Sequence, residues 1–360
     1  YEENSMILKN IKTPDYCTIN FKDGYSVSLS ATNGTISAPI TQSTGYNGTV
    51  SFTVTPASGY QNVLETNTCG GTLSGNTYTV SKVTSNKSCS ITFKKNGTVL
   101  SSLIKSYATS HTNGVYNENG YRYEGTDPSN YIYMTNKSTN GKELWRIIGV
   151  FNDGENGEEV IRVRHAYLRL KYDSNKTNHF PKTTMYSALS STYNLNNYSH
   201  TVNFKMYLGT SDQVNNLTSS EWYTAERGTT SGKTAADSYN NSVSFIGSVG
   251  LIYPSDYGYA VLASDCPRTK ELYNYDGTAA CYNNNWLYQG NNRRQEQWLI
   301  SPSASYDRAA FIVNYEGFVD DSNGGYEVYE AFASSPVMSL EAGVIVSGSG
   351  TKTDPYTITN

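Results

Sequence analysis

The sequence predicts a multidomain protein in which a small all-β repeat module is followed by a large α+β domain. One observation is a repeated pattern, since residues 11–22 and 83–94 match at an offset of 72 positions (83 minus 11), which indicates tandem modules. A second is the alternation of apolar and polar residues in these segments, which is typical of half-buried β-strands. A third is the change after residue 95, where the repeat stops, with segments of strand period and helical period following one another from about residue 120.

The repeat divides the N-terminal part of the chain. The apolar and cysteine positions that coincide at this offset are Ile11 with Val83, Cys17 with Cys89, Ile19 with Ile91 and Phe21 with Phe93. Residues 1–22 are therefore predicted to be the end of a preceding, truncated β repeat, and residues 23–95 a complete module. The alternative is that residues 1–22 only add an edge strand that carries a free thiol.

The five cysteines are Cys17, Cys69, Cys89, Cys266 and Cys281. They form no CxxC pair and no Cys/His cluster with the spacing of a zinc site. Cys69 and Cys89 bracket part of one module, and Cys266 and Cys281 bracket one short loop, so we expect these two disulfides. The repeat offset places the partner of Cys17 before the first residue (69 minus 72), which predicts that the chain is a fragment of a longer array.

The composition favours an extracellular protein. The chain has 360 residues, 31 acidic and 27 basic, and its sparse, unclustered basic residues argue against a nucleic-acid partner. No apolar run approaches the roughly 20 residues that a membrane-spanning helix needs. Only 16% of the residues are charged, and tyrosine occurs 32 times against 10 phenylalanines. Low charge with many hydroxyl and amide side chains is typical of extracellular bacterial β proteins.

The complete module is predicted to contain only short strands and turns. "YSVSLSATNGTISAP" is an alternating strand, an Asn33-Gly34 turn and a second strand. "SFTVTPASGY" followed by "YTVSKVTSNKSCSITF" resembles the divergent internalin B-repeat family, and this resemblance covers residues 23–95. It implies a small stalk module of a cell-surface protein of Gram-positive bacteria, in which stacked modules hold a head away from the cell wall.

Residues 96–119 change character and are predicted to be a linker. The segment "VLSSLIKSYA" has apolar residues at helical spacing, which predicts a short helix. A stretch rich in glycine and asparagine follows it, which is typical of a connection between domains.

Residues 120–360 are predicted to form one head domain. "LWRIIGVF" and "VIRVRHAYL" have the composition of strands, and "TTMYSALSSTYNLNNY" has the spacing of an amphipathic helix. "YTAERGTTSGKTAAD" is polar and is expected to be irregular. The strands "QWLI", "AAFIVN" and "VMSL" are expected to form the core sheet, and Trp145, Trp286 and Trp298 to be core residues.

Several motifs of the head appear together in one order. "LWRIIGVF", "GLIYPSDYGYA", "NNNWL", "WLISPS" and "FIVNYEGFV" resemble a family of secreted Gram-positive gut-bacterial proteins. The C-terminal part of that family is similar to the C-type-lectin-like fold, which formylglycine-generating enzymes and the variable proteins of diversity-generating retroelements also use. The chain departs from the family where Ser335 precedes Pro336, because the family carries arginine there. The departure puts a buried polar network in doubt.

The sequence gives no reason to expect catalysis. Ser255 and Asp256 have no histidine at a spacing that would suggest a triad, and Cys266 and Cys281 are expected to be paired with each other. The acidic segment "DGENGEE" fits no standard calcium loop, and a solvated turn is the favoured interpretation. C-type lectins often bind calcium, but "FVDDSNGGYEVYE" comes without the sugar-binding tripeptide patterns of lectins, so no metal is expected there either. We therefore expect no enzyme, no metal and no cofactor.

The C-terminal stretch between Ser303 and Ser335 favours binding. It is dense in tyrosine, aspartate, asparagine, serine and glycine, as antibody surfaces are. The residues expected to share one exposed, ligand-binding face are Tyr306, Asp307, Arg308, Tyr315, Glu316, Asp320, Asp321, Tyr326 and Tyr329. The same composition fits retroelement diversification and the ordinary polar surface of a tyrosine-rich secreted protein, and the sequence leaves both open.

The predicted function is that of an extracellular, surface-displayed adhesin that binds a host or bacterial surface protein or glycan. One alternative is a structural subunit of a surface filament or layer, which self-association would produce and electron microscopy would reveal. Another is a degenerate enzyme of the formylglycine-generating type, which copper between cysteines would reveal.

Overall fold

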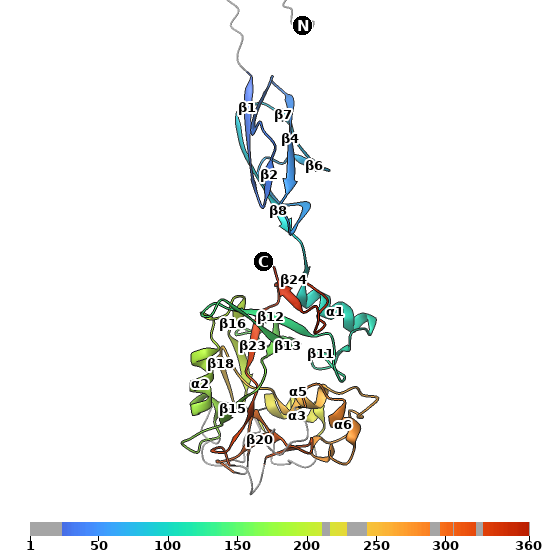
Figure 1. Ribbon diagram of the computed structural model, residues 1–360, viewed down its shortest axis with the longest axis vertical. Helices are drawn as coiled ribbons and strands as arrows, with labels where there is room; N and C mark the ends of the chain where they lie inside the picture. Colours follow the sequence, from blue (N-terminus) through green and yellow to red (C-terminus); the bar gives the residue numbers. More distant parts are fainter. Residues whose placement is uncertain are drawn as a thin grey trace, which may run out of the picture. The chain divides into compact units, whose positions relative to one another are not determined.

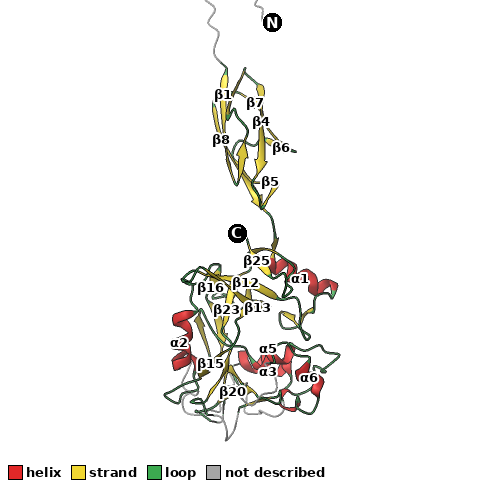
Figure 2. Cartoon of the chain, viewed as in Figure 1, coloured by secondary structure: helices red, strands yellow, loops and turns green. Residues whose placement is uncertain are grey.

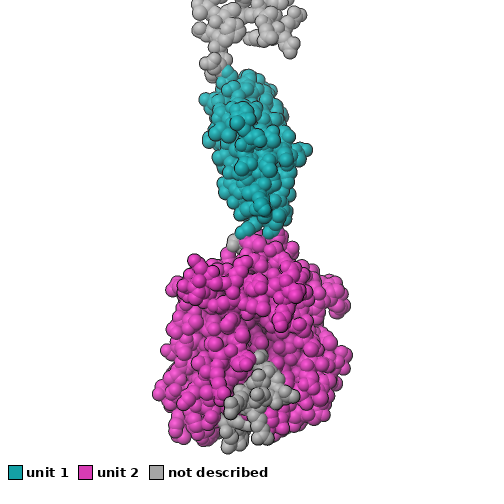
Figure 3. All heavy atoms as spheres, viewed as in Figure 1, with its two compact units in different colours: residues 1–96 teal, residues 97–360 magenta. Residues whose placement is uncertain are grey.

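The computed structural model describes residues 24–210, 217–228, 243–288, 296–304, 306–321 and 327–359 (Figure 1). The chain divides into two compact units, Tyr1–Asn96 and Gly97–Asn360, which Figure 3 colours separately. The expected multidomain organisation, a β module before an α+β domain, is confirmed, because every helix in the described residues belongs to the second unit. Residues 1–22, with Cys17, lie outside the described residues.

Unit 1 consists of two four-stranded sheets that share one hydrophobic core. One sheet has the order β3-β1-β8-β5 and the other β2-β4-β7-β6. The strands are β1 (Tyr25–Thr32), β2 (Gly34–Ile36), β3 (Thr41–Thr44), β4 (Gly48–Pro56), β5 (Tyr60–Asn67), β6 (Thr72–Ser74), β7 (Thr77–Val83) and β8 (Lys87–Lys95). The alternation seen in the sequence places Val50, Phe52 and Val54 of β4 inside and the residues between them outside.

Two local predictions for unit 1 are confirmed. Asn33 adopts the left-handed conformation (φ 61°) between β1 and β2, as a turn asparagine readily does. Cys69 and Cys89 form a disulfide with an S–S distance of 2.04 Å. Such a cross-link restricts the unfolded chain of a module whose core is small.

Unit 2 is built on two main sheets and a hairpin. The larger sheet runs β16-β23-β14-β13-β12-β25-β24-β9, with β10 and β11 joined through β13, and the smaller runs β15-β22-β19-β20-β21. The strands of the larger sheet are β9 (Thr98–Val99), β10 (Val115–Asn117), β11 (Tyr121–Tyr123), β12 (Tyr131–Asn136), β13 (Gly141–Phe151), β14 (Val160–Arg164), β16 (Thr201–Val202), β23 (Val337–Glu341), β24 (Ile345–Ser347) and β25 (Tyr356–Ile358). Those of the smaller sheet are β15 (Leu168–Lys171), β19 (Gln297–Pro302), β20 (Ala310–Val313), β21 (Val319–Asp320) and β22 (Ala331–Ser334), and β17 (Phe204–Tyr207) pairs with β18 (Ser244–Gly247).

The helices of unit 2 are short and lie beside these sheets (Figure 2). They are α1 (Leu100–Ser110), α2 (Thr184–Thr192), α3 (Ser219–Arg227), α5 (Pro254–Tyr259) and α6 (Ala279–Asn283), with 3-10 turns at Phe180–Lys182 and Leu272–Asn274. The predicted amphipathic helix is confirmed as α2. Among the described residues, none of the helices combines the length and the apolar character required to cross a membrane.

The segment predicted as a linker is part of the second unit. The predicted helix forms α1, but its apolar side is buried, with Leu100 and Ile104 fully inaccessible to solvent. β9 pairs with β24, and β10 pairs with β11. The composition of residues 96–119 resembles a linker because the exposed side of α1 and the following turns are polar, whereas the buried side is only a narrow apolar stripe.

The core sheet predicted for the head is divided between two sheets. β19 and β20 belong to the smaller sheet, but β23 lies in the larger one. β19 and β20 are buried along their whole length, so their side chains do not alternate between core and solvent. Trp145, Trp286 and Trp298 are core residues as predicted.

The polar segment predicted as irregular contains a helix. α3 ends at Arg227, and the residues from 229 to 242 lie outside the described part of the chain. The start of α3 has a capping box, because the Thr218 backbone N–H donates to Glu221 (2.8 Å) and the Thr218 hydroxyl accepts from the Glu221 N–H. A threonine followed three positions later by glutamate is the sequence signal for this start, and it was missed.

Candidate functional site

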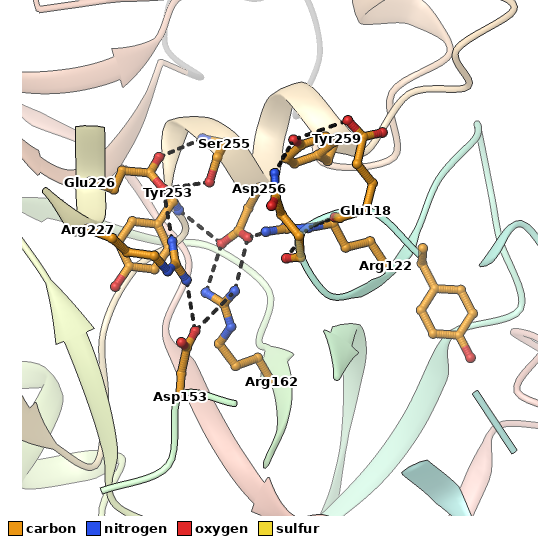
Figure 4. A network of polar contacts seen from close by, with 12 residues as sticks. Glu118, Arg122, Asp153, Arg162, Glu226, Arg227, Tyr253, Ser255, Asp256 and Tyr259 are labelled. Atoms are coloured by element: carbon orange, nitrogen blue, oxygen red, sulfur yellow. Dashed lines mark hydrogen bonds and ion pairs between the residues drawn. The ribbon is translucent and has the colours of Figure 1, made fainter. Parts of the chain in front are cut away.

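The centre of unit 2 holds a carboxylate between two buried arginines (Figure 4). Asp256, in the first turn of α5, accepts hydrogen bonds from Arg122 (2.8 Å) and Arg162 (3.2 and 3.3 Å). The backbone N–H of Tyr253 donates to the same carboxylate (3.1 Å). Burial by itself would raise the pKa of Asp256, but Arg162 and Arg122 together hold it below its usual value.

The two arginines reach Asp256 from different strands. Arg122 lies on β11 and Arg162 on β14, and both are almost completely buried. The Arg162 guanidinium lies 3.6 Å from the ring centroid of Phe151, and the Arg122 guanidinium lies 4.6 Å from that of Tyr259. Aromatic faces are a favourable environment for a cation that has lost its water. The ion pairs therefore connect α5 with two strands of the larger sheet.

A second carboxylate extends this network toward the surface. Asp153 follows β13 and accepts a hydrogen bond from Arg227 of α3 (2.9 Å), with Arg162 at 3.8 Å on its other side. Burial works to lower the pKa of Arg227, but Asp153 and neighbouring groups raise it above its usual value. Asp153 was predicted to lie in a solvated acidic turn, and this is wrong because the side chain turns inward to the two cations.

A third carboxylate, that of Glu226, lies beside the network and has a raised pKa. Glu226 of α3 is fully buried and accepts two hydrogen bonds from Ser255, from its N–H (2.8 Å) and its hydroxyl (2.6 Å). Burial raises its pKa to about 7, although Arg227 and Ser255 oppose the shift. Ser255 therefore serves as a hydrogen-bond donor to a buried carboxyl group.

The stability of the protein should respond to pH through Glu226. Its folded-state pKa of about 7 lies above the ordinary 4.5, so between these values the folded chain binds more protons than the unfolded chain. Stability should then fall as pH rises through this window, by about 3 kcal/mol. Urea unfolding of the wild type and of Glu226→Gln, measured from pH 4.5 to 8, should show that the variant lacks this decrease.

Glu221→Gln is the matched control for that measurement. It changes a glutamate of the same helix whose pKa is lowered by hydrogen bonds from Thr218, so it should lower stability slightly at every pH and keep the decrease. Equal pH slopes for the wild type and Glu226→Gln would show that Glu226 does not titrate in this range.

Ser335, where the sequence departs from the resembled family, has an arginine as a neighbour. Arg164 of β14 donates to the Ser335 hydroxyl (3.0 Å), and both residues are buried. Burial, with Arg146 as a second cause, lowers the pKa of Arg164 to about 9. A guanidinium therefore does reach this position, but it comes from the neighbouring strand.

Part of the predicted binding face does come together. Tyr306 is 36% exposed and Tyr329 37% exposed, and Arg308 is also exposed. The Tyr306 hydroxyl donates to Glu327 (3.2 Å), and a hydrogen bond to Glu327 raises the pKa of both tyrosines. Arg308 is attached to the same segment, because its carbonyl accepts from the N–H of Val328 (2.8 Å). We call Tyr306, Arg308, Glu327 and Tyr329 the tyrosine patch.

The other predicted residues lie elsewhere. Tyr315 and Glu316 occupy the turn between β20 and β21, at the opposite end of β20 from Tyr306. Asp321 was expected to be exposed but is buried, and its carboxylate accepts from Ser303 (2.8 Å). The sequence does not reveal that Asp321 is buried, because an aspartate in a polar loop can face either the solvent or a buried hydroxyl group.

The remaining members of the predicted face take intermediate positions. Asp307 and Asp320 are half-buried, and Tyr326 lies outside the described residues. The predicted single face is therefore reduced to the tyrosine patch with Asp307 beside Arg308. The Tyr288 hydroxyl donates to the Tyr315 carbonyl (2.5 Å), so the tyrosine that contacts the β20–β21 turn is not a member of the tyrosine patch.

Described residues of the acidic segments and the four described cysteines are engaged in protein contacts. Glu158 accepts from the N–H of Asn156 (2.7 Å), and Glu159 forms an ion pair with Lys105. Cys266 and Cys281 form the predicted disulfide (S–S 1.98 Å) and are fully buried. In the described ranges no group of three or more His, Cys, Asp or Glu side chains is arranged to hold a metal ion.

The buried network escaped the sequence interpretation, although one signal for it was present. "VIRVR" places Arg162 and Arg164 in a strand that is otherwise apolar, and a buried arginine needs a partner. The partners could not be found, because they follow β13 and lie on α3 and α5, far away in the sequence. Comparisons of the chain with models of protein families, with curated proteins and with solved structures found no match.

Proposed function

We propose that the protein is an extracellular, surface-displayed ligand-binding protein, with unit 2 as a lectin-like head and unit 1 as a module of its stalk. The ligand is a host or bacterial surface protein or glycan. The two disulfides and the low charge of the chain are compatible with an extracellular location. The observation that carries the proposal is the tyrosine patch.

The tyrosine patch has the properties of a binding surface. Tyr306 and Tyr329 come from loops that are separate in the sequence, yet both hydroxyls share the carboxylate of Glu327. Lys176 lies 5.6 Å from the ring centroid of Tyr329 and adds a cation to the patch. Two exposed tyrosines held by one carboxylate lose little entropy when a partner covers them, and tyrosine and arginine are frequent hot spots.

The arrangement of the strands in unit 2 also supports the proposal. The first and last strands of unit 2 lie together in the larger sheet, because β9 pairs with β24 and β24 with β25. The patch belongs to loops of the smaller sheet, next to β20 and β22. The first and last described strands of unit 2 therefore belong to one sheet, while loops of the other sheet carry the patch.

Binding should depend on the tyrosine patch and not on the fold alone. Screening of the whole chain on glycan and surface-protein arrays would identify a ligand. The double variant Tyr306→Ala/Tyr329→Ala should then weaken its affinity by at least about 30-fold, the equivalent of about 2 kcal/mol, with an unchanged melting temperature. The same affinity in the double variant and the wild type would rule out the patch as the binding site.

Tyr46→Ala is the matched control. Tyr46 is 75% exposed but belongs to unit 1, so its replacement removes an exposed ring without touching the patch. The control variant should bind as the wild type does.

A further inference from the structure

A polar pocket of about 520 Å³ lies beside the buried charge network, within unit 2. Its wall is formed by α1, β10, the end of β13, β17 and α3, and it includes Asp153 and Arg227. It shares no residue with the tyrosine patch. We propose that this pocket is a second binding site and that it takes a neutral saccharide.

The charges that line the pocket are already neutralised by the protein. Asp153 is paired with Arg227 (2.9 Å), and Glu159 is paired with Lys105. The charges of the two carboxylates and the two cations cancel, so the pocket wall has no net charge that would attract a charged ligand. An anionic or cationic ligand would have to break one of these pairs, so the wall favours a ligand without net charge.

Several polar groups of the wall remain available. The side-chain amides of Asn117 and Asn152 are exposed and make no hydrogen bond with any described residue. The hydroxyl groups of Tyr121, Tyr207 and Tyr223 are likewise without a hydrogen-bond partner in the described ranges. These groups both donate and accept, and the hydroxyl groups of a sugar do the same.

The aromatic rings supply the apolar part of the recognition. Arg227 lies 3.7 Å from the ring centroid of Tyr223 and 4.7 Å from that of Tyr207, so these two rings flank one fixed guanidinium. Tyrosine combines an apolar ring with a polar tip, which matches a sugar ring that carries C–H groups on its face and hydroxyls on its rim. The aliphatic side chain in the wall, Val150, is buried, so the pocket offers no exposed aliphatic surface to an apolar peptide side chain.

The pocket wall is held in place before a ligand arrives. Asp153 contacts Arg162, and Arg162 is bound to Asp256, so the pair of Asp153 and Arg227 in the pocket wall continues into the buried network. A site whose charged groups are fixed by buried partners loses little freedom on binding.

The test uses the whole chain and neutral oligosaccharides of glucose, galactose and N-acetylglucosamine, with binding followed by saturation-transfer NMR at up to about 10 mM ligand, above the millimolar Kd of weak binding. At least one of them should bind. Asn117→Ala/Asn152→Ala should weaken that binding by about tenfold or more, since two hydrogen bonds are lost, with no change in melting temperature.

The double variant of the tyrosine patch, Tyr306→Ala/Tyr329→Ala, should bind the oligosaccharide as the wild type does. This result distinguishes binding in the pocket from binding at the tyrosine patch. Three results would overturn the pocket assignment: no neutral oligosaccharide binds, the bound one is unaffected by Asn117→Ala/Asn152→Ala, or its binding is lost only in the patch variant.

Discussion

Replacing Asp256 with asparagine should destabilise unit 2 by about 3–5 kcal/mol, which lowers its melting temperature by roughly 10 °C. The asparagine has nearly the same shape but no charge, so Arg122 and Arg162 would remain buried without the carboxylate that both contact. A cation that is removed from water and left without its counter-charge is far more costly than a missing neutral hydrogen bond. Thermal and urea unfolding of the full chain would measure the effect.

Asp127→Asn is the matched control for this experiment. Asp127 also pairs with an arginine, Arg146 at 3.0 Å, but its side chain is 59% exposed. Surface ion pairs of this kind contribute at most about 1 kcal/mol, so the control should unfold close to the wild type. Similar losses in both variants would show that water reaches Asp256 and that the network is not a buried one.

A chain that starts at residue 120 should fail to fold into a cooperative unit 2. It lacks α1 and the strands β9 and β10, and with them the buried side chains of Leu100, Ile104 and Val115. Each of these contributes about 1.5–3 kcal/mol by burial, and the total approaches the entire stability of a typical domain. Circular dichroism and size-exclusion chromatography should show a loosely folded or aggregated chain.

The comparison for this truncation is a chain that starts at residue 97. It also lacks unit 1 but keeps α1, β9 and β10, so it should unfold cooperatively. A cooperative transition of equal midpoint in both truncated chains would mean that residues 97–119 are a linker after all, as the sequence predicted, and that their packing contributes little.

The organisation of unit 1 was accessible from the sequence because its signals are local. Strict alternation identifies the buried side of β4, and the spacing of Cys69 and Cys89 within one repeat identifies the disulfide. The α1 helix was likewise found from its apolar spacing. Its place in unit 2 was not found from the sequence. A helix that packs on a sheet and a helix in a linker can have the same apolar stripe, and they differ only in the residues that pack against it. Those residues come from other parts of the chain.

The candidate site of unit 2 was only partly accessible. Tyr306 and Tyr329 were identified from composition, since exposed tyrosines in polar loops stand out in the sequence. Asp321 was misjudged, because burial of a single loop aspartate depends on whether a distant hydroxyl, here that of Ser303, reaches it. Tyr315 was grouped with Tyr306 because they are close in the sequence, although β20 separates them.

By itself the sequence determined the two-part organisation, the two disulfides, the tryptophan core and the tyrosine-rich surface, because each depends on residue type and short spacing. Only the tertiary structure decided that residues 97–119 complete unit 2, and that Asp153, Glu226 and Asp256 meet three arginines in its interior. Those charges come from two strands, two helices and a loop that are dispersed along the chain. Their pairing follows from the large cost of burying any one of them alone, and that cost becomes visible only when the fold brings them together.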